Sequence, residues 1–176
     1  VSSQAWASGS RWLKPGTHLA AGNISLSIIN PATRSHVSWS LKPEYGRFLL
    51  RGLYLHSNFD LSISHVYNGH NQPKDKDIEW VHGFNLYLGL GLRYYFELSP
   101  QILPYVGASF SFSLPPLQRM NNGKMEDYFR WKVDLQAGVL IPLYANIAVN
   151  GTLTLHSVVP WEAFSLSFTT GLVFHL

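Results

Sequence analysis

Cysteine is absent from the 176-residue chain, which excludes disulfides, thiolate metal sites and cysteine nucleophiles. Charged residues are also scarce, at 13% of the chain, which is roughly half of their usual share in a soluble domain. Long apolar runs are missing too, since no stretch reaches the roughly 18 residues that a membrane helix needs. This combination is typical of a membrane protein built from strands, because each strand shows only alternate residues to lipid.

The formal net charge is only +3, and no basic run with interleaved aromatics occurs. We therefore predict no nucleic-acid partner. The histidines show no spacing that builds a metal site, and we predict no metal and no cofactor. The chain starts at Val1 without a positively charged stretch that leads into an apolar one. A signal peptide has therefore either been removed or was never there.

The clearest pattern in the chain is the alternation over residues 84–98. Leu88, Leu90 and Leu92 alternate there with Gly89, Gly91 and Arg93. Strict period-2 alternation predicts a strand with two different faces. The segment is also long compared with the roughly 5–6 residues of a typical soluble strand.

Weaker versions of this pattern recur and predict eight strands, at 16–29, 46–56, 58–67, 84–98, 102–114, 128–141, 145–156 and 164–176. Short links are predicted at 57–58, 99–101 and 142–143, and longer polar links at 30–46, 68–79 and 115–127. Short turns at one end and long loops at the other are typical of outer-membrane barrels. We predict one all-β domain: a closed antiparallel up-and-down transmembrane barrel over residues 16–176, preceded by a periplasmic segment at 1–15.

The polar faces of the predicted strands decide between a soluble and a membrane barrel. They carry small residues such as Gly89, Gly138, Ser165 and Gly171, which fit the narrow lumen of eight strands. A face exposed to water would carry many Lys and Glu instead. Aromatics gather near strand ends and predict two interfacial girdles, one with Tyr94, Phe96, Tyr105 and Tyr144, the other with Trp80, Phe129, Trp131 and Trp161.

The C-terminal residues Thr169, Gly171, Phe174 and Leu176 resemble the assembly signal of outer-membrane barrels. This resemblance implies recognition by a barrel-assembly machinery, a bacterial-type outer-membrane location, and contact with the lipid bilayer and lipopolysaccharide. The whole pattern is similar to the OmpX-like, OmpW-like and opacity-type families of small eight-stranded barrels. That resemblance implies adhesion, passage of small apolar molecules or membrane stabilisation, and fold alone does not choose among these roles.

Six charged residues are predicted to face the lumen: Arg51, Arg93, Glu97, Arg130, Lys132 and Asp134. Buried charges are costly unless they are paired, so the preferred interpretation is a plug of salt bridges that fills the barrel. The alternative is a polar path for small solutes. With Arg51 in the lumen, Phe48, Leu50 and Tyr54 are predicted to face outward.

His156 is a candidate general base. Hairpin register places it near Tyr128 and Arg130 on one side and near Ser165 on the other. A hydroxyl beside a histidine could suit acyl transfer or hydrolysis on lipid A, although catalysis also needs an orienting acceptor. Asp134 is predicted to lie deeper in the barrel. The alternative is a histidine packed among polar lumen groups.

Three functions remain open from the sequence. The leading hypothesis is a non-enzymatic outer-membrane barrel with a narrow plugged lumen, whose exterior loops bind a surface, a protein partner or a larger assembly. The second is a channel for small apolar solutes, and the third is a lipid A enzyme that uses His156 and Ser165. The residues proposed for recognition in the loops are Arg34, Trp39, Lys42, Arg119, Lys124 and Glu126.

Overall fold

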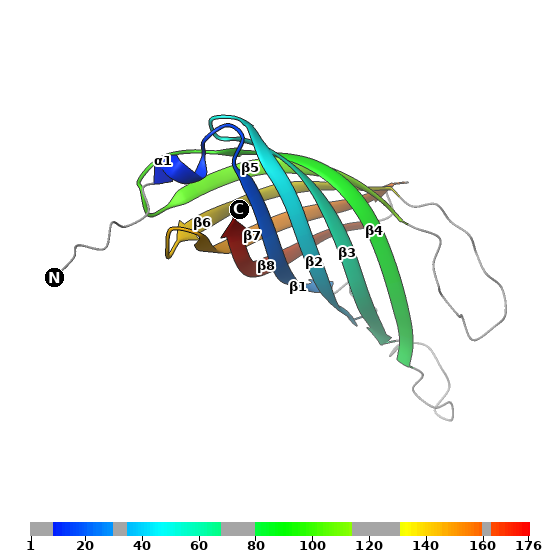
Figure 1. The fold of residues 1–176 in the computed structure, drawn as a ribbon. Coiled ribbons are helices and arrows are strands. Elements are labelled where there is room, and N and C mark those ends of the chain that lie inside the picture. The colour runs from blue at the N-terminus through cyan, green and yellow to red at the C-terminus, as the bar shows by residue number, and fades with distance from the viewer. Residues whose placement is uncertain (1–8, 30–34, 68–79, 114–130, 160–162) are drawn as a thin grey trace, which may run out of the picture.

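The computed structural model describes residues 9–29, 35–67, 80–113, 131–159 and 163–176. Each strand pairs antiparallel with its neighbour in the chain, and β1 pairs with β8 to close the barrel (Figure 1). This confirms the predicted closed, eight-stranded antiparallel barrel. The elements are α1 (Gly9–Trp12), β1 (His18–Ile29), β2 (Ser35–Leu50), β3 (Leu53–Tyr67), β4 (Trp80–Tyr95), β5 (Leu103–Ser113), β6 (Trp131–Pro142), β7 (Ile147–Val159) and β8 (Ala163–His175).

The strands separate an apolar exterior from a mixed interior, as their alternation predicts. In β4, Leu90 and Leu92 point outward and are 64% and 47% exposed. Gly91 and Arg93 between and beside them are buried. Among the described residues, no helix is both long and apolar enough to cross a bilayer.

The short connections, α1 and the C-terminus share one end of the barrel (Figure 1). The Leu176 amide donates to the His18 carbonyl there at 3.0 Å, which ties the chain's end to β1. A two-residue turn at Arg51 and Gly52 joins β2 to β3, and Gly52 has a φ of 80°. A side chain is strained in that backbone region, and a Cβ on Gly52 would lie 2.7 Å from the Tyr95 carbonyl oxygen.

The first half of the strand assignment needs correction. The predicted loop at 30–46 and strand at 46–56 are wrong, because β2 already begins at Ser35 and the turn lies at residues 51–52 rather than 57–58. Lys42, Pro43 and Glu44 suggested a loop, yet they lie within β2. Lys42 and Glu44 have interior partners, and Pro43 is on the opposite, exposed face.

The predicted orientation of this hairpin is also wrong for two residues. Phe48 and Tyr54 face inward and are 0% and 1% exposed, whereas Leu50 faces outward as predicted. The pairing of β2 with β3 shifts between Phe48 and Leu50, and both Leu49 and Leu50 are exposed as a result. This local irregularity breaks the period-2 pattern on which the prediction depended.

An apolar cluster fills the interior at the short-turn end, and we call it the apolar plug. Trp12, the last residue of α1, and Leu13, which follows it, enter the plug and are almost completely buried. Hydrogen bonds from Gly52 to the Leu13 carbonyl (3.3 Å) and from Gly16 to the Phe48 carbonyl (2.8 Å) hold this segment in place. Part of the segment predicted to precede the barrel therefore closes it. The plug comprises Trp12, Leu13, Leu19, Ala21, Phe48, Tyr54, Tyr95, Leu103, Tyr105, Leu140, Ala148 and Val173.

Candidate functional site

Above the plug, the lumen contains a layer of buried polar side chains, which we call the polar layer. Its charged members number three basic and three acidic among the described residues, so the layer carries no net formal charge when its histidine is neutral. Because successive strands place their alternate residues on the inner face, residues far apart in sequence meet there. The layer comprises Lys42, Glu44, Asp60, Arg93, Ser109, Lys132, Asp134, Gln136, His156 and Ser167.

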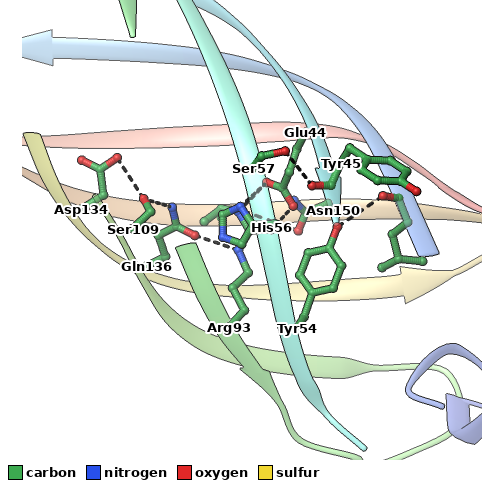
Figure 2. A network of polar contacts seen from close by, with 12 residues as sticks. Glu44, Tyr45, Tyr54, His56, Ser57, Arg93, Ser109, Asp134, Gln136 and Asn150 are labelled. Carbon is green, nitrogen blue, oxygen red and sulfur yellow. Dashed lines mark hydrogen bonds and ion pairs between the residues drawn. The ribbon is translucent and has the colours of Figure 1, made fainter. Parts of the chain in front are cut away.

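The pair formed by Glu44 and Arg93 is the part of the polar layer nearest the plug. Both guanidinium Nη atoms donate to the Glu44 carboxylate at 2.7 Å, and Nε donates to Gln136 Oε1 at 2.7 Å. Two parallel bonds of this kind fix both the distance and the orientation of the groups. His56 Nδ1 lies 3.6 Å from the same carboxylate, and Figure 2 shows the two side chains beside each other.

A relay of neutral groups connects this pair to the outer half of the layer. Gln136 Nε2 donates to Ser109 Oγ at 3.2 Å, and Ser109 Oγ donates to Asp134 Oδ2 at 3.4 Å (Figure 2). The glutamine therefore accepts from Arg93 and donates to the serine. The polar layer is consequently one continuous network across β2, β4, β5 and β6.

The outer half of the layer contains two lysines that share one carboxylate. Lys132 Nζ lies 3.0 Å from Asp60 Oδ2 and 3.5 Å from Asp134 Oδ2. Lys42 Nζ approaches the same Asp60 oxygen at 3.5 Å. Each ion thus has at least one oppositely charged neighbour, which is the condition under which buried charges are tolerated.

His156 links the network to β8. Its Nδ1 lies 2.6 Å from Asp134 Oδ1, and its Nε2 lies 2.5 Å from Ser167 Oγ. A carboxylate only accepts hydrogen bonds, so Nδ1 carries the proton of a neutral ring and Nε2 accepts from the serine hydroxyl. The register prediction for His156 was wrong, because its partner on β6 is Asp134 rather than residues 128–130.

The order carboxylate, imidazole and hydroxyl is the one that serine hydrolases use. Here all three side chains are buried, with exposed fractions of 3% for Asp134, 6% for His156 and 2% for Ser167. Catalysis would also need donors for an oxyanion, whereas β7 and β8 are paired along this stretch of the ladder. The arrangement as it stands holds the imidazole in one tautomer and ties three strands together.

Ser165, the hydroxyl predicted to serve His156, is its register partner on β8. The His156 ring nevertheless bonds Ser167 instead. The predicted pair is therefore close in the ladder, but a different serine takes the hydrogen bond.

The described part of the lumen contains a cavity of about 20 Å³. This volume is enough for roughly one water molecule and too small for an organic solute. Its lining combines both halves of the polar layer with small polar residues, namely Asn23, Lys42, Glu44, Asn58, Arg93, Asp134, Gln136, Thr152, Thr154 and Thr169.

The six residues predicted for the lumen have three different outcomes. Arg93, Lys132 and Asp134 lie in the polar layer. Arg51 and Glu97 do not, and this part of the prediction is wrong: they form an ion pair at the short-turn end, with their side chains 69% and 31% exposed. The reason is that Arg51 is a turn residue and Glu97 follows the end of β4. Arg130 lies outside the described residues.

The residues predicted for exterior recognition are also divided. Trp39 and Lys42 are not loop residues, because both lie in β2. Trp39 faces outward and is 53% exposed, and Lys42 reaches Asp60 in the lumen. Four others, Arg34, Arg119, Lys124 and Glu126, lie outside the described residues.

The predicted aromatic girdle at the short-turn end needs one correction. Tyr94, Phe96 and Tyr144 are exposed on the outside, by 48%, 42% and 64%. Tyr105 instead lies in the plug, where its hydroxyl donates to Asn150 at 2.8 Å. At the other end Trp131 is exposed, while the side chains of Trp80, Phe129 and Trp161 lie outside the described ones.

Sequence reasoning did not identify Lys42, Glu44, Asp60 and Gln136 as members of the polar layer, where they are the partners of Arg93, Lys132 and Ser109. The alternation of inner and outer positions along a strand could have identified three of them. Once the β2–β3 turn is placed at residues 51–52, positions 42, 44 and 60 all fall on the inner face. Charged residues at inward positions of two paired strands then predict mutual partners.

The residues that resemble an assembly signal lie on β8 and just after it. Phe174 and Leu176 point outward and are 40% and 67% exposed. Thr169 points inward and is buried. Gly171 leaves no room for a side chain, since a Cβ there would lie 2.3 Å from Asn23 Oδ1.

In the described ranges, no three His, Asp or Glu side chains are grouped so as to hold a metal ion.

No protein-family model matches the chain, and no curated protein matches its sequence. Solved structures do match it in fold. Neisserial surface protein A is 16% identical, with 90% of this chain and 96% of that chain covered and a TM-score of 0.56.

Two further solved structures, one natural and one designed, also match this fold. Ail, the attachment invasion locus protein of Yersinia pestis, is 9% identical over 93% of this chain and 99% of its own, with a TM-score of 0.55. A de novo designed transmembrane β-barrel is 15% identical over 93% and 98%, with a TM-score of 0.52. Small outer-membrane barrels therefore share this fold. A designed barrel shares the fold as well, so this similarity does not indicate a function.

Proposed function

We propose that this chain is a non-enzymatic, integral outer-membrane barrel with a closed lumen, and that its exterior segments bind a surface, a partner protein or a larger assembly. In this proposal the short turns face the periplasm. The lipid bilayer and lipopolysaccharide surround the barrel, and the barrel-assembly machinery inserts it through the C-terminal residues.

The observation that carries this proposal is the filling of the lumen. The apolar plug closes the short-turn end, and within the described residues the polar layer above it lines a cavity of about 20 Å³. Opening the lumen would separate these paired charges, and a buried charge without its partner is strongly destabilising. A filled interior supports a function on the outside of the barrel over passage of solutes through it.

The fold matches agree with an outer-membrane location, since surface protein A and Ail are small barrels of this kind. Ail is named for attachment and invasion. At 9% identity the match supports the fold alone, so the name of Ail serves only to suggest an adherence assay.

Planar-bilayer recording tests the closed lumen. The refolded full chain should give no conductance steps above those of protein-free membranes, while an open porin inserted in the same way serves as positive control. Steady ohmic steps from the refolded chain would overturn the closed barrel and favour the solute channel.

Adherence assays test the exterior function. Residues 68–79 and 115–127 are each replaced by a Gly-Ser pair, and bacteria that display equal amounts of each variant are applied to epithelial monolayers. Each replacement should lower adherence relative to the unaltered chain. Equal adherence of all variants and of bacteria without the protein would reject this function.

A further inference from the structure

The formal charge of the chain is distributed unevenly, although its sum is small. The polar layer contains three basic and three acidic residues and contributes nothing. The segments 30–34, 68–79, 114–130 and 160–162 contain six basic and six acidic residues and also contribute nothing. The whole net charge of +3 therefore belongs to five remaining residues, which are Arg11, Lys14, Arg47, Arg51 and Glu97.

All five residues lie at the short-turn end of the barrel. Arg51 and Glu97 pair with each other. That leaves Arg11, Lys14 and Arg47, and within the described part of the chain none of these three pairs with an acidic side chain. All three are exposed, and we call them the basic collar.

Backbone contacts hold the collar together. The Thr17 amide donates to the Lys14 carbonyl at 3.1 Å, and Gly16 and Phe48 are joined by a 2.8 Å hydrogen bond. The Arg47 guanidinium lies beside this turn, since a Cβ on Gly16 would be 3.7 Å from its Nη2. Arg11 lies in α1, whose Trp12 packs edge-on against His175. Two chain segments thus place cations at the same rim.

The level of the collar along the barrel identifies its surroundings. Arg47 lies two residues from Tyr45 on the outer face of β2, and Tyr45 is 50% exposed. The exposed aromatics Tyr94 and Tyr144 belong to the same end. Amphipathic rings of this kind settle at the headgroup level of a bilayer, which is also where basic side chains meet anionic lipids.

From this geometry we propose that Arg11, Lys14 and Arg47 bind the phosphodiester headgroups of anionic glycerophospholipids in the leaflet at the short-turn end. The inference rests on the membrane barrel of the proposed function, but not on its closed lumen or its exterior binding. The lipid headgroup is preferred over soluble phosphate because Arg47 points outward from a membrane strand at the interface, where the phosphate is held by its acyl chains.

Native mass spectrometry of the refolded full chain in detergent measures this binding. The protein is titrated with dioleoyl phosphatidylglycerol or dioleoyl phosphatidylcholine, and the bound lipids are counted. The unaltered chain should retain phosphatidylglycerol preferentially, and the preference should decline as salt is raised. The triple variant Arg11→Gln, Lys14→Gln and Arg47→Gln should lose the preference by at least about tenfold, because each basic residue near an anionic surface adds to the attraction.

The matched control is the double variant Arg51→Gln with Glu97→Gln. It removes two charges at the same rim and leaves the net charge at +3, so it should keep the preference of the unaltered chain. Heat-dependent migration on gels verifies that each variant is folded. Substitutions are confined to exposed side chains, so both variants are expected to fold.

Three results would overturn the proposal. They are equal retention of both lipids by the unaltered chain, a preference that survives in the triple variant, and displacement of bound phosphatidylglycerol by an equal concentration of inorganic phosphate. A conducting barrel that still selects phosphatidylglycerol would reject the closed lumen and leave this proposal intact.

Discussion

The two halves of the described lumen are filled by opposite kinds of chemistry. At the short-turn end, rings pack on rings: the Tyr95 and Tyr105 centroids are 4.8 Å apart, and those of Phe48 and Tyr54 are 5.0 Å apart. Above them, ions and amides replace the rings. The plug also draws Trp12 and Leu13 from outside the strands, whereas the polar layer consists only of strand residues.

This difference predicts two different responses to mutation. In apolar packing, the loss of stability scales with the buried side-chain volume that a mutation removes, because each buried apolar group contributes separately. A buried ion network responds unevenly. Removing one partner leaves an uncompensated charge, while removing both can be nearly neutral. The predictions below separate these responses, in order of decreasing effect.

Arg93→Met should have the largest effect, because it leaves the Glu44 carboxylate without its two hydrogen bonds. We expect a loss of about 4 kcal/mol in the free energy of unfolding, within the range for breaking a buried pair. Urea unfolding in phospholipid vesicles measures it. The double variant Glu44→Gln with Arg93→Met should regain at least half of the loss. A double variant as unstable as the single one would mean that the polar layer does not behave as an ion network.

Trp12→Ala tests the plug, since the indole is 0% exposed there. We expect a loss of about 3 kcal/mol, as for other buried aromatic truncations. Trp12→Phe should lose less, because most of the ring volume remains. Neither variant should conduct ions, because the polar layer still fills the lumen. A conductance step in Trp12→Ala alone would show that the plug is the main barrier.

The barrel itself could be predicted from sequence because its cause is local. Alternation over residues 84–98 fixes which face of β4 is apolar without knowledge of any other strand. Small residues such as Gly91 indicate in the same way which face of the strand points into the lumen. A Cβ on Gly91 would lie 2.4 Å from His56 Nε2, so a larger residue would displace that histidine.

The polar layer could be predicted only in part, because its contacts depend on register between distant strands. Lys132 meets Asp60 from β3, and no spacing along the chain indicates this. The turn at residues 51–52 and the irregularity beside it were predicted to be continuous strand, and this reversed the orientation inferred for Phe48 and Tyr54. Arg51 was assigned to the lumen by the same error.

The connection through His156 should give the smallest effects, and it tests how far the polar layer extends. Ser167→Ala removes one hydrogen bond to Nε2, and we expect a loss of about 1 kcal/mol. His156→Ala removes both ring contacts, but Asp134 keeps Lys132 at 3.5 Å. Its loss should therefore be about 2 kcal/mol, as for the removal of two hydrogen bonds, which is well below that of Arg93→Met. Urea unfolding of both single variants and the double variant gives the coupling between the two residues.

A fluorophosphonate probe distinguishes this structural role from a catalytic one, because it labels a serine only when the hydroxyl is activated and accessible. The folded chain should remain unlabelled, and Ser167→Ala should be indistinguishable from it in the labelling assay. Labelling that disappears in both Ser167→Ala and His156→Ala would instead show a working nucleophile. In that case Ser167, which is only 2% exposed in this structure, would belong to a site that opens, and the non-enzymatic proposal would fail. The stability loss alone does not separate these roles, since a hydrogen bond stabilises the barrel whether or not its hydroxyl reacts.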